Sequence, residues 1–113
     1  MAEIEGVYII SVAARLLAMH PQTLRKYERM GLVEPSRTGG MLRLYSAEDL
    51  ALLRFIKHLV EDQGLNLAGV QLALRLARSL RRLRQLVPEG EGSRQSEIGQ
   101  EVERMMRVLG LIT

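Results

Sequence analysis

Residues 20–31, with the sequence HPQTLRKYERMG, decide which fold we expect for this chain. The residue before a proline is disfavoured in helices, whereas proline itself fits the first helical position, so a helix begins at Pro21. It ends before Gly31, because glycine readily adopts the left-handed conformation that often follows the last helical turn. Gln, Thr, Arg and Lys are frequent between these two points, and such side chains contact DNA bases and phosphates. The segment therefore indicates a helix that enters the major groove of DNA.

A second helix and a small β-ribbon flank this segment. Ser11 precedes a run of helix formers at residues 12–19 and is a preferred N-cap, which predicts a first helix that begins there. After Gly31, the chain contains the pair Gly39-Gly40, and apolar residues alternate with Arg and Tyr over residues 42–45. This pattern predicts two short strands joined by a turn. Two short helices followed by a ribbon form the layout of a winged helix-turn-helix.

The second half of the chain predicts longer helices. Ser46 caps a helix that continues to Gly64, and Asn66 caps another that has no Gly or Pro over residues 70–87. Residues 88–92, PEGEG, interrupt this element, and a last helix follows. We expect the two last helices to form a hairpin, with the interruption as its turn. Short apolar seams are marginal alone in water, so we also expect this hairpin to pair with that of a second chain.

Apolar residues in these two helices recur at spacings of three and four, as in the seam of a helix–helix interface. They are Leu76, Leu80, Leu83 and Val87 in the first helix and Ile98, Val102, Met105 and Leu109 in the second. We expect these residues to form the dimer interface. The expected fold is therefore mainly α, with a winged helix-turn-helix DNA-binding domain over residues 1–74 and a helical dimerisation hairpin and tail over residues 75–113.

The composition favours a nucleic-acid partner and argues against several other classes of protein. The 113 residues carry a net charge of +3, and residues 8–87 hold 13 Lys and Arg against 6 Asp and Glu. A basic body of this kind favours a polyanionic partner. The sequence has no cysteine, which excludes disulfides, thiolate metal sites and thiol-based sensing. No apolar run is long enough to span a membrane and no basic secretory signal begins the chain, so we expect a cytoplasmic protein.

No group of residues predicts catalysis, a metal or a cofactor. His58 has only Asp62 as a neighbour of ligand type at helical spacing, and stable metal sites need three or four ligands. Glu48 and Asp49 are explained by the start of a helix, where acidic side chains are favourable. The sequence has no nucleophilic arrangement and no phosphate-binding glycine loop. We therefore expect neither an enzyme nor a cofactor, and no small-molecule effector.

Three segments resemble the MerR family of transcriptional regulators. They are residues 11–14 (SVAA), 23–32 (TLRKYERMGL) and 43–50 (RLYSAEDL). Residues 20–25 (HPQTLR), 37–40 (RTGG) and 66–70 (NLAGV) are similar to the heat-shock repressor branch of that family, HspR. The resemblance implies a symmetric dimer on an inverted-repeat operator, with one helix of each subunit in a major groove and the wing on the flanking backbone. It also implies control of chaperone genes, with a DnaK-type chaperone as co-repressor.

The expected DNA contacts lie in the helix at Pro21 and in the ribbon. Gln22, Thr23 and Arg25 are of types that reach base edges, since Gln pairs with adenine and Arg with guanine. The remaining candidates are His20, Lys26, Tyr27, Arg29, Arg37, Arg43 and Tyr45. Of these, Tyr27, Arg43 and Tyr45 match family positions, as does Arg25. Two departures matter, because Lys26 replaces a second tyrosine and Met41-Leu42 replace Gly-Tyr, so phosphate contacts by those tyrosines are not carried over.

Other interpretations share part of these observations. A winged-helix DNA-bending protein of the excisionase type has a similar fold, but it needs no dedicated dimer helices. A protein-interaction adaptor would carry the same basic face without binding DNA. The five arginines over residues 75–84 also leave two interpretations open. They either face Glu97, Glu101 and Glu103 across the hairpin or make additional contacts to DNA.

Overall fold

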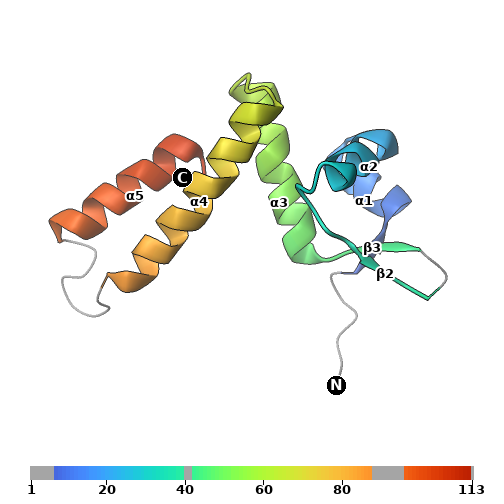
Figure 1. The fold of residues 1–113 in the computed structure, drawn as a ribbon, viewed down its shortest axis with the longest axis horizontal. Coiled ribbons are helices and arrows are strands. Elements are labelled where there is room, and N and C mark those ends of the chain that lie inside the picture. The colour runs from blue at the N-terminus through green and yellow to red at the C-terminus, as the bar shows by residue number, and fades with distance from the viewer. Residues whose placement is uncertain (1–6, 40–41, 88–95, 113) are drawn as a thin grey trace. The chain divides into compact units, whose positions relative to one another are not determined.

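The computed structural model of the chain describes residues 7–39, 42–87 and 96–112, and most of these residues are helical (Figure 1). The chain forms two compact units, Met1–Lys57 and His58–Thr113. The boundary lies where one helix ends and a short π-helix begins, whereas the expected boundary at residue 74 lies inside a continuous helix.

The first unit combines three helices with a three-stranded antiparallel sheet in its described part. In chain order its elements are β1 (Tyr8–Ile9), α1 (Ile10–Leu17), α2 (Pro21–Arg29), β2 (Ser36–Arg37), β3 (Arg43–Tyr45) and α3 (Ala47–Lys57). The strands lie in the order β1-β3-β2, with Tyr8 opposite Tyr45 and Arg37 opposite Arg43. The mainly helical fold with a small β-ribbon is therefore confirmed.

The helix that begins at Pro21 is confirmed, whereas the expected start of the first helix is wrong. Pro21 occupies the first turn of α2, and Gly31 follows its end at φ +77°. α1 begins at Ile10, so Ser11 lies inside the helix that we expected it to cap. The cause is β1, which leads directly into α1 and is too short to show an alternating pattern in the sequence. The expected turn at Gly39-Gly40 falls partly outside the described residues.

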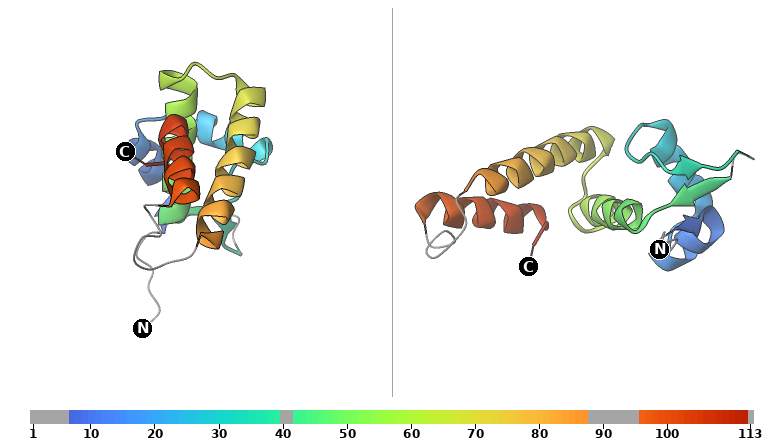
Figure 2. Two further views of the ribbon diagram at one scale, coloured as in Figure 1. Left: turned by 90° about the vertical axis from the view of Figure 1, so that its left-hand side faces the viewer. Right: turned by 90° about the horizontal axis from the view of Figure 1, so that it is seen from below.

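The second unit is built around a helical hairpin. It comprises the π-helix η1 (His58–Asp62), α4 (Leu67–Leu86) and α5 (Glu97–Leu109). α4 and α5 lie side by side and run in opposite directions (Figures 1 and 2). Leu80 of α4 packs with Val102 and Met106 of α5 in the centre of the hairpin. The expected hairpin is therefore present, and the expected turn at residues 88–92 lies outside the described residues.

Side-chain caps begin the later helices, as the sequence indicates for Ser46 and Asn66. The Ser46 hydroxyl accepts a hydrogen bond from the Asp49 backbone N–H at 3.0 Å, and the Asp49 carboxylate accepts one from the Ser46 N–H at 2.9 Å. Asn66 accepts a backbone N–H at the start of α4 at 2.9 Å, and Ser96 does the same for α5 at 3.0 Å. These bonds satisfy N–H groups that a helix leaves unpaired in its first turn.

The end of α5 contacts η1 through a glycine. Gly110 follows α5 at φ +83°, a conformation that residues with a side chain rarely adopt. A Cβ atom at this position would lie 2.7 Å from Nε2 of His58, which is too close for an ordinary contact. His58 is held in place by its Nδ1, which donates to the Asp62 carboxylate at 2.8 Å. Gly110 therefore allows the chain to turn while lying directly against the imidazole.

We predict that Gly110→Ala destabilises the protein more than Gly64→Ala does. Both positions have positive φ, but nothing lies within 4 Å of a Cβ atom added at Gly64. The left-handed conformation costs each variant about 1–2 kcal/mol, and the clash with His58 adds to that cost only at Gly110. Thermal unfolding measures the difference, and adding His58→Ala to Gly110→Ala should recover part of the loss. Equal losses in the two single variants would contradict the contact.

Candidate nucleic-acid interface

The turn between α1 and α2 is held by a lysine from a distant helix. Ala18, the residue after α1, adopts a left-handed conformation at φ +54°. At the end of α3, the Lys57 ammonium donates to the carbonyl of Leu17 at 2.9 Å and to that of Ala18 at 3.4 Å. A positive charge at the carbonyl end of a helix is favourable because of the helix dipole. Lys57 therefore stabilises the turn from which α2 departs.

His20, which we expected to contact DNA, caps α2 in this structure. Its Nδ1 accepts a hydrogen bond from the backbone N–H of Gln22 at 3.0 Å. When the imidazole is neutral, its proton therefore lies on Nε2. The cap fixes the first turn of α2, which holds Gln22 and Thr23.

α2 has a polar face that is accessible to solvent. Gln22, Lys26 and Arg29 are exposed, whereas Thr23 and Arg25 are half-buried. The three exposed residues are spaced by four and three positions, so they lie on one side of the helix. Five of the residues expected to contact DNA thus come from two turns of one helix, with the three exposed ones on a common face.

Tyr27 and Tyr45, which we expected to contact DNA, lie in the core. Tyr27 is 6% exposed and Tyr45 is completely buried. Burial raises the pKa of the Tyr45 hydroxyl, and the negative charge of Glu28 raises it further. The hydroxyl remains protonated at neutral pH and has no hydrogen-bond partner among the described residues. Both rings therefore support α2 and β3 by packing and are not accessible to a duplex in this structure.

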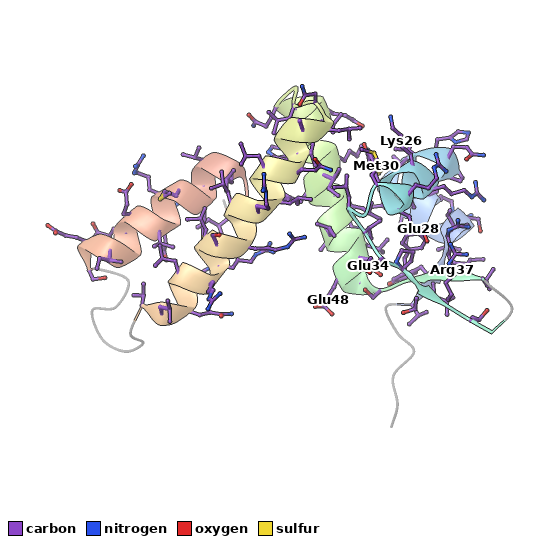
Figure 3. The ribbon with its side chains drawn as sticks, in the orientation of Figure 1. Lys26, Glu28, Met30, Glu34, Arg37 and Glu48 are labelled. Carbon is purple, nitrogen blue, oxygen red and sulfur yellow. The ribbon has the colours of Figure 1, made fainter. Side chains whose placement is uncertain are left out.

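One carboxylate joins α2 to the two strands of the wing. Through one oxygen Glu28 accepts a hydrogen bond from Nε of Arg43 at 2.5 Å, and through the other it accepts one from Nη2 of Arg37 at 2.8 Å. Figure 3 shows Glu28 and Arg37 on the neighbouring elements α2 and β2. The side chain of Glu28 is 19% exposed. The two wing arginines expected to bind phosphates are therefore tied to the helix expected to read bases.

The two arginines also keep Glu28 charged. Partial burial raises the pKa of its carboxyl, but the hydrogen bonds and positive charges of Arg43 and Arg37 outweigh this effect and lower the pKa below its ordinary value of 4.5. The pKa of the Glu28 carboxyl is lower in the folded chain than in the unfolded chain, so the ion pairs stabilise the native state fully above about pH 4.5. This stabilisation is lost as the pH falls through the folded pKa.

The two ion pairs found in the described part of the hairpin both lie within α5. Glu101 binds Arg104, and Glu103 lies 3.6 Å from Arg107. Glu101 and Glu103 therefore do not pair with the arginines of α4 across the hairpin in this structure, which corrects that interpretation. The arginines of α4 are exposed, and no ion pair of theirs is found within the described ranges. They are Arg75, Arg78, Arg81, Arg82 and Arg84.

Two other kinds of site are absent from the part of the chain that the structure describes. No three side chains of the ligand-forming types come together there to hold a metal ion. His58 meets Asp62, as its helical spacing indicates. No helix in the described ranges combines the length and apolar character needed to cross a membrane.

Glu28 and Lys57 belong to this site but were not predicted from the sequence. Glu28 is the only acidic residue between Tyr8 and Val33 and stands in a basic helix, and this isolation was the available signal. Lys57 gives no comparable signal, because a lysine in the last turn of a helix is already explained by the dipole of its own helix. Its contact with Leu17 joins residues 40 positions apart.

A family model described as MerR HTH family regulatory protein matches residues 8–77, which include the two helices, the wing and α3. The chain belongs to the MerR family. It has the DNA-binding fold of that family, and the winged helix-turn-helix expected from the sequence is confirmed. Several of its curated relatives are described as HTH-type transcriptional regulators.

Curated relatives of this MerR-family chain match over the same region. The putative heat shock protein HspR of Streptomyces coelicolor is 53% identical over 76 residues, which cover 67% of this chain and 50% of that protein. The HTH-type transcriptional regulator GlnR of Bacillus cereus is 40% identical over 68 residues, which cover 60% of this chain and 52% of that protein. The chain thus spans about half the length of the curated relatives it matches.

Solved structures of MerR regulators share the fold. A transcriptional regulator of the MerR family from Bacillus cereus has a TM-score of 0.57 at 28% identity, covering 92% of this chain and 75% of that one. HiNmlR, a MerR family regulator lacking the sensor domain and bound to promoter DNA, has a TM-score of 0.59 at 20% identity. That match covers 92% of this chain and 79% of the other, and at this identity it supports the fold alone.

We predict that Gln22→Ala and Lys26→Ala impair DNA binding in different ways. Loss of a base contact at Gln22 should cost about 1–3 kcal/mol at the cognate site and relax the base preference there. Loss of a phosphate contact at Lys26 should weaken binding to all duplexes alike and reduce the salt dependence. Titrations with an operator selected from random duplexes, and with a random duplex of equal length, measure both effects. If Gln22→Ala weakens both duplexes equally, the base contact is wrong.

Proposed function

We propose that this chain is a repressor that binds an inverted-repeat operator as a dimer and controls heat-shock or chaperone genes. The observation that supports this function best is the 53% identity with the putative heat shock protein HspR, in a match that covers 67% of this chain. The DNA-binding fold of the MerR family agrees with it. In this proposal residues 1–74 bind DNA, and residues 75–113 form the dimerisation hairpin and tail.

The proposed DNA contacts come from α2, its cap and the wing. Bases are contacted by Gln22, Thr23 and Arg25, and the sugar-phosphate backbone by His20, Lys26, Arg29, Arg37 and Arg43. The assignment follows from chemistry, since the first group pairs with base edges in the major groove and the second supplies donors for phosphate oxygens. The common face of Gln22, Lys26 and Arg29 supports it.

The residues expected at the dimer interface fall into two groups. Leu80, Val102 and Leu109 pack inside the hairpin of a single chain, and Val87 is half-buried. Leu76, Leu83, Ile98 and Met105 are exposed. The exposed group is the one available to a second chain, so the dimer that we propose rests on it.

Two further leucines extend the exposed group along α4. Leu72 is 52% exposed and Leu86 is 73% exposed. Together with Leu76 and Leu83 they follow spacings of four, seven and three, which places all four on one side of the helix. At about 1.5 Å per residue this apolar stripe is about 21 Å long. Exposed apolar surface of this extent is typical of an interaction site, and a second copy of the hairpin would cover it.

α4 therefore has two apolar sides with different uses. The buried side includes Val70, Ala77 and Leu80, and Leu80 meets α5. The apolar stripe that begins at Leu72 and ends at Leu86 lies on another side of the helix. A helix with a single partner needs only one apolar side, so the second side supports the proposal of an additional partner.

We further propose that protein-folding stress controls the repressor. The HspR resemblance implies a DnaK-type chaperone as co-repressor, and the tail over residues 93–113 is the segment that DNA binding explains least. A second mechanism uses the hairpin itself. Its centre contains Leu80, Val102 and Met106, with Leu109, Leu111 and Ile112 partly buried against them. A core of this size would open locally on mild heating. The two chains of the dimer would then separate and leave the operator without the action of a chaperone.

We predict that Leu76→Asp combined with Leu83→Asp yields a monomer with weak operator affinity. Charge on the apolar stripe opposes pairing, and a monomer loses the linked second half-site. Leu80 is unsuitable for this test because it is buried within the hairpin. Gln71→Asp combined with Gln85→Asp adds the same charge elsewhere on the exposed surface of α4 and should remain dimeric. Sedimentation measures the state of both, and a dimeric leucine variant would place the interface elsewhere.

We predict that operator occupancy responds either to a chaperone or to heat. In the first arm, purified DnaK-type chaperone is titrated into the protein–operator complex at fixed temperature, and a co-repressor should increase occupancy. In the second arm the complex is heated without chaperone, and a melting hairpin should release the operator while α2 and the wing remain folded. Circular dichroism recorded beside the binding signal identifies the unfolding step. If neither treatment changes occupancy, control by folding stress is wrong and the DNA-binding function stands alone.

A further inference from the structure

Glu28 is an acidic side chain in the helix that faces DNA in the proposed function. Its neighbours Arg25, Lys26 and Arg29 are all basic, and each favours a polyanion. A carboxylate in this position repels phosphates and lowers the affinity for any duplex. Its presence therefore calls for a role that a neutral residue would not fill.

The contacts of Glu28 position the wing relative to α2. Arg37 and Arg43 are directly opposite each other in the pairing of β2 with β3. Glu28 binds both, with one oxygen to each guanidinium, at 2.8 Å and 2.5 Å. The two strands are therefore held to the helix at a single point of the ribbon. A wing held in this way meets the phosphate backbone at a set distance from the groove that α2 occupies.

Glu28 also reduces the charge that the wing presents. Two arginines opposite each other repel, and a shared carboxylate offsets that repulsion. The three side chains together carry a charge of +1, where the arginines alone would carry +2. A guanidinium has five N–H donors, and the bond to Glu28 uses only one donor of Arg43. Arg43 can therefore bind a phosphate while remaining bound to Glu28.

We propose that Glu28 is a positioning residue that determines specificity. By holding Arg37 and Arg43 at a set distance from α2 and masking part of their charge, it disfavours random duplexes more than the operator. A random duplex derives its affinity mainly from charge, which Glu28 reduces. An operator whose groove geometry fits the fixed wing keeps its phosphate contacts, so its affinity falls less. This inference rests on the proposed binding of DNA by α2 and the wing.

Three variants separate the charge of Glu28 from its shape and from charge elsewhere. Glu28→Gln keeps the size of the side chain and removes its charge, whereas Glu28→Asp keeps the charge and shortens the side chain. Glu34→Gln removes the same charge from an exposed position of the same unit, for which no ion pair is found in the described ranges (Figure 3). The full-length wild type and the three variants are titrated with a selected operator and with a random duplex at four salt concentrations. Thermal unfolding of each is recorded in parallel.

We expect Glu28→Gln to bind the random duplex about tenfold more tightly and the operator less than about threefold more tightly, so that the ratio of operator to random affinity falls about threefold or more. The affinity of this variant for random duplex should also depend more steeply on salt. The slope of log K against log salt concentration should steepen by about 0.9 for each additional phosphate that the protein neutralises. Glu28→Asp should retain more of the affinity ratio than Glu28→Gln, and Glu34→Gln should change that ratio less than twofold. These results support the proposal.

Other results overturn it. If Glu28→Gln binds both duplexes more weakly by the same factor, the residue is purely structural. If Glu28→Asp has a lower ratio of operator to random affinity than Glu28→Gln, the shape of the side chain matters and its charge does not. If Glu34→Gln lowers this ratio as much as Glu28→Gln does, the effect is a general one of charge. A wild-type chain that binds random duplex but selects no operator overturns the proposed function. The titrations of wild type and Glu28→Gln with random duplex then decide by themselves whether Glu28 masks charge. Failure to bind any duplex overturns both.

Discussion

The hydrogen bonds of Lys57 hold the turn between α1 and α2, and the geometry of the proposed DNA-binding surface depends on this turn. α1 ends at Leu17, and the chain passes through a left-handed residue, Ala18, before α2 begins. Such a conformation is unfavourable for a residue with a side chain by about 1–2 kcal/mol. The Lys57 ammonium binds the two carbonyls at this point and complements the negative end of α1. α3, which supplies Lys57, thereby holds a turn to which it is not adjacent in sequence.

The wing is also held by a polar contact between elements that are distant in sequence. Ion pairs there take the place of the apolar core that a two-stranded ribbon lacks. β2 and β3 have two and three residues, too few to bury a sizeable apolar surface. Tyr45 anchors β3 in the core, and Glu28 ties both strands to α2. In the proposed function the same two arginines bind Glu28 and nearby phosphates, with different donors of each guanidinium. Stability and recognition are thus coupled in one group of three side chains.

Local signals in the sequence, which act between neighbouring residues, determined where most of the helices begin. They located the start of α2 at Pro21, the capping box at Ser46 and the cap at Asn66. The spacing of apolar residues predicted the hairpin, and the order of the segments together with their residues indicated the MerR family. The same signals failed for β1, whose two residues form a strand only because β3 pairs with them.

Only the tertiary structure decided which side of each element faces inward. Tyr27 and Tyr45 match the family pattern as well as Arg25 does, yet their rings are buried, because packing against other elements determines burial and spacing does not. The eight apolar residues of the expected seam look alike in sequence, but the antiparallel contact of α4 with α5 divides them into buried and exposed groups. Glu28 with Arg43 and Lys57 with Leu17 join residues 15 and 40 positions apart. Such contacts leave no periodic trace in a single sequence, because they depend on the path of the whole chain between the two partners.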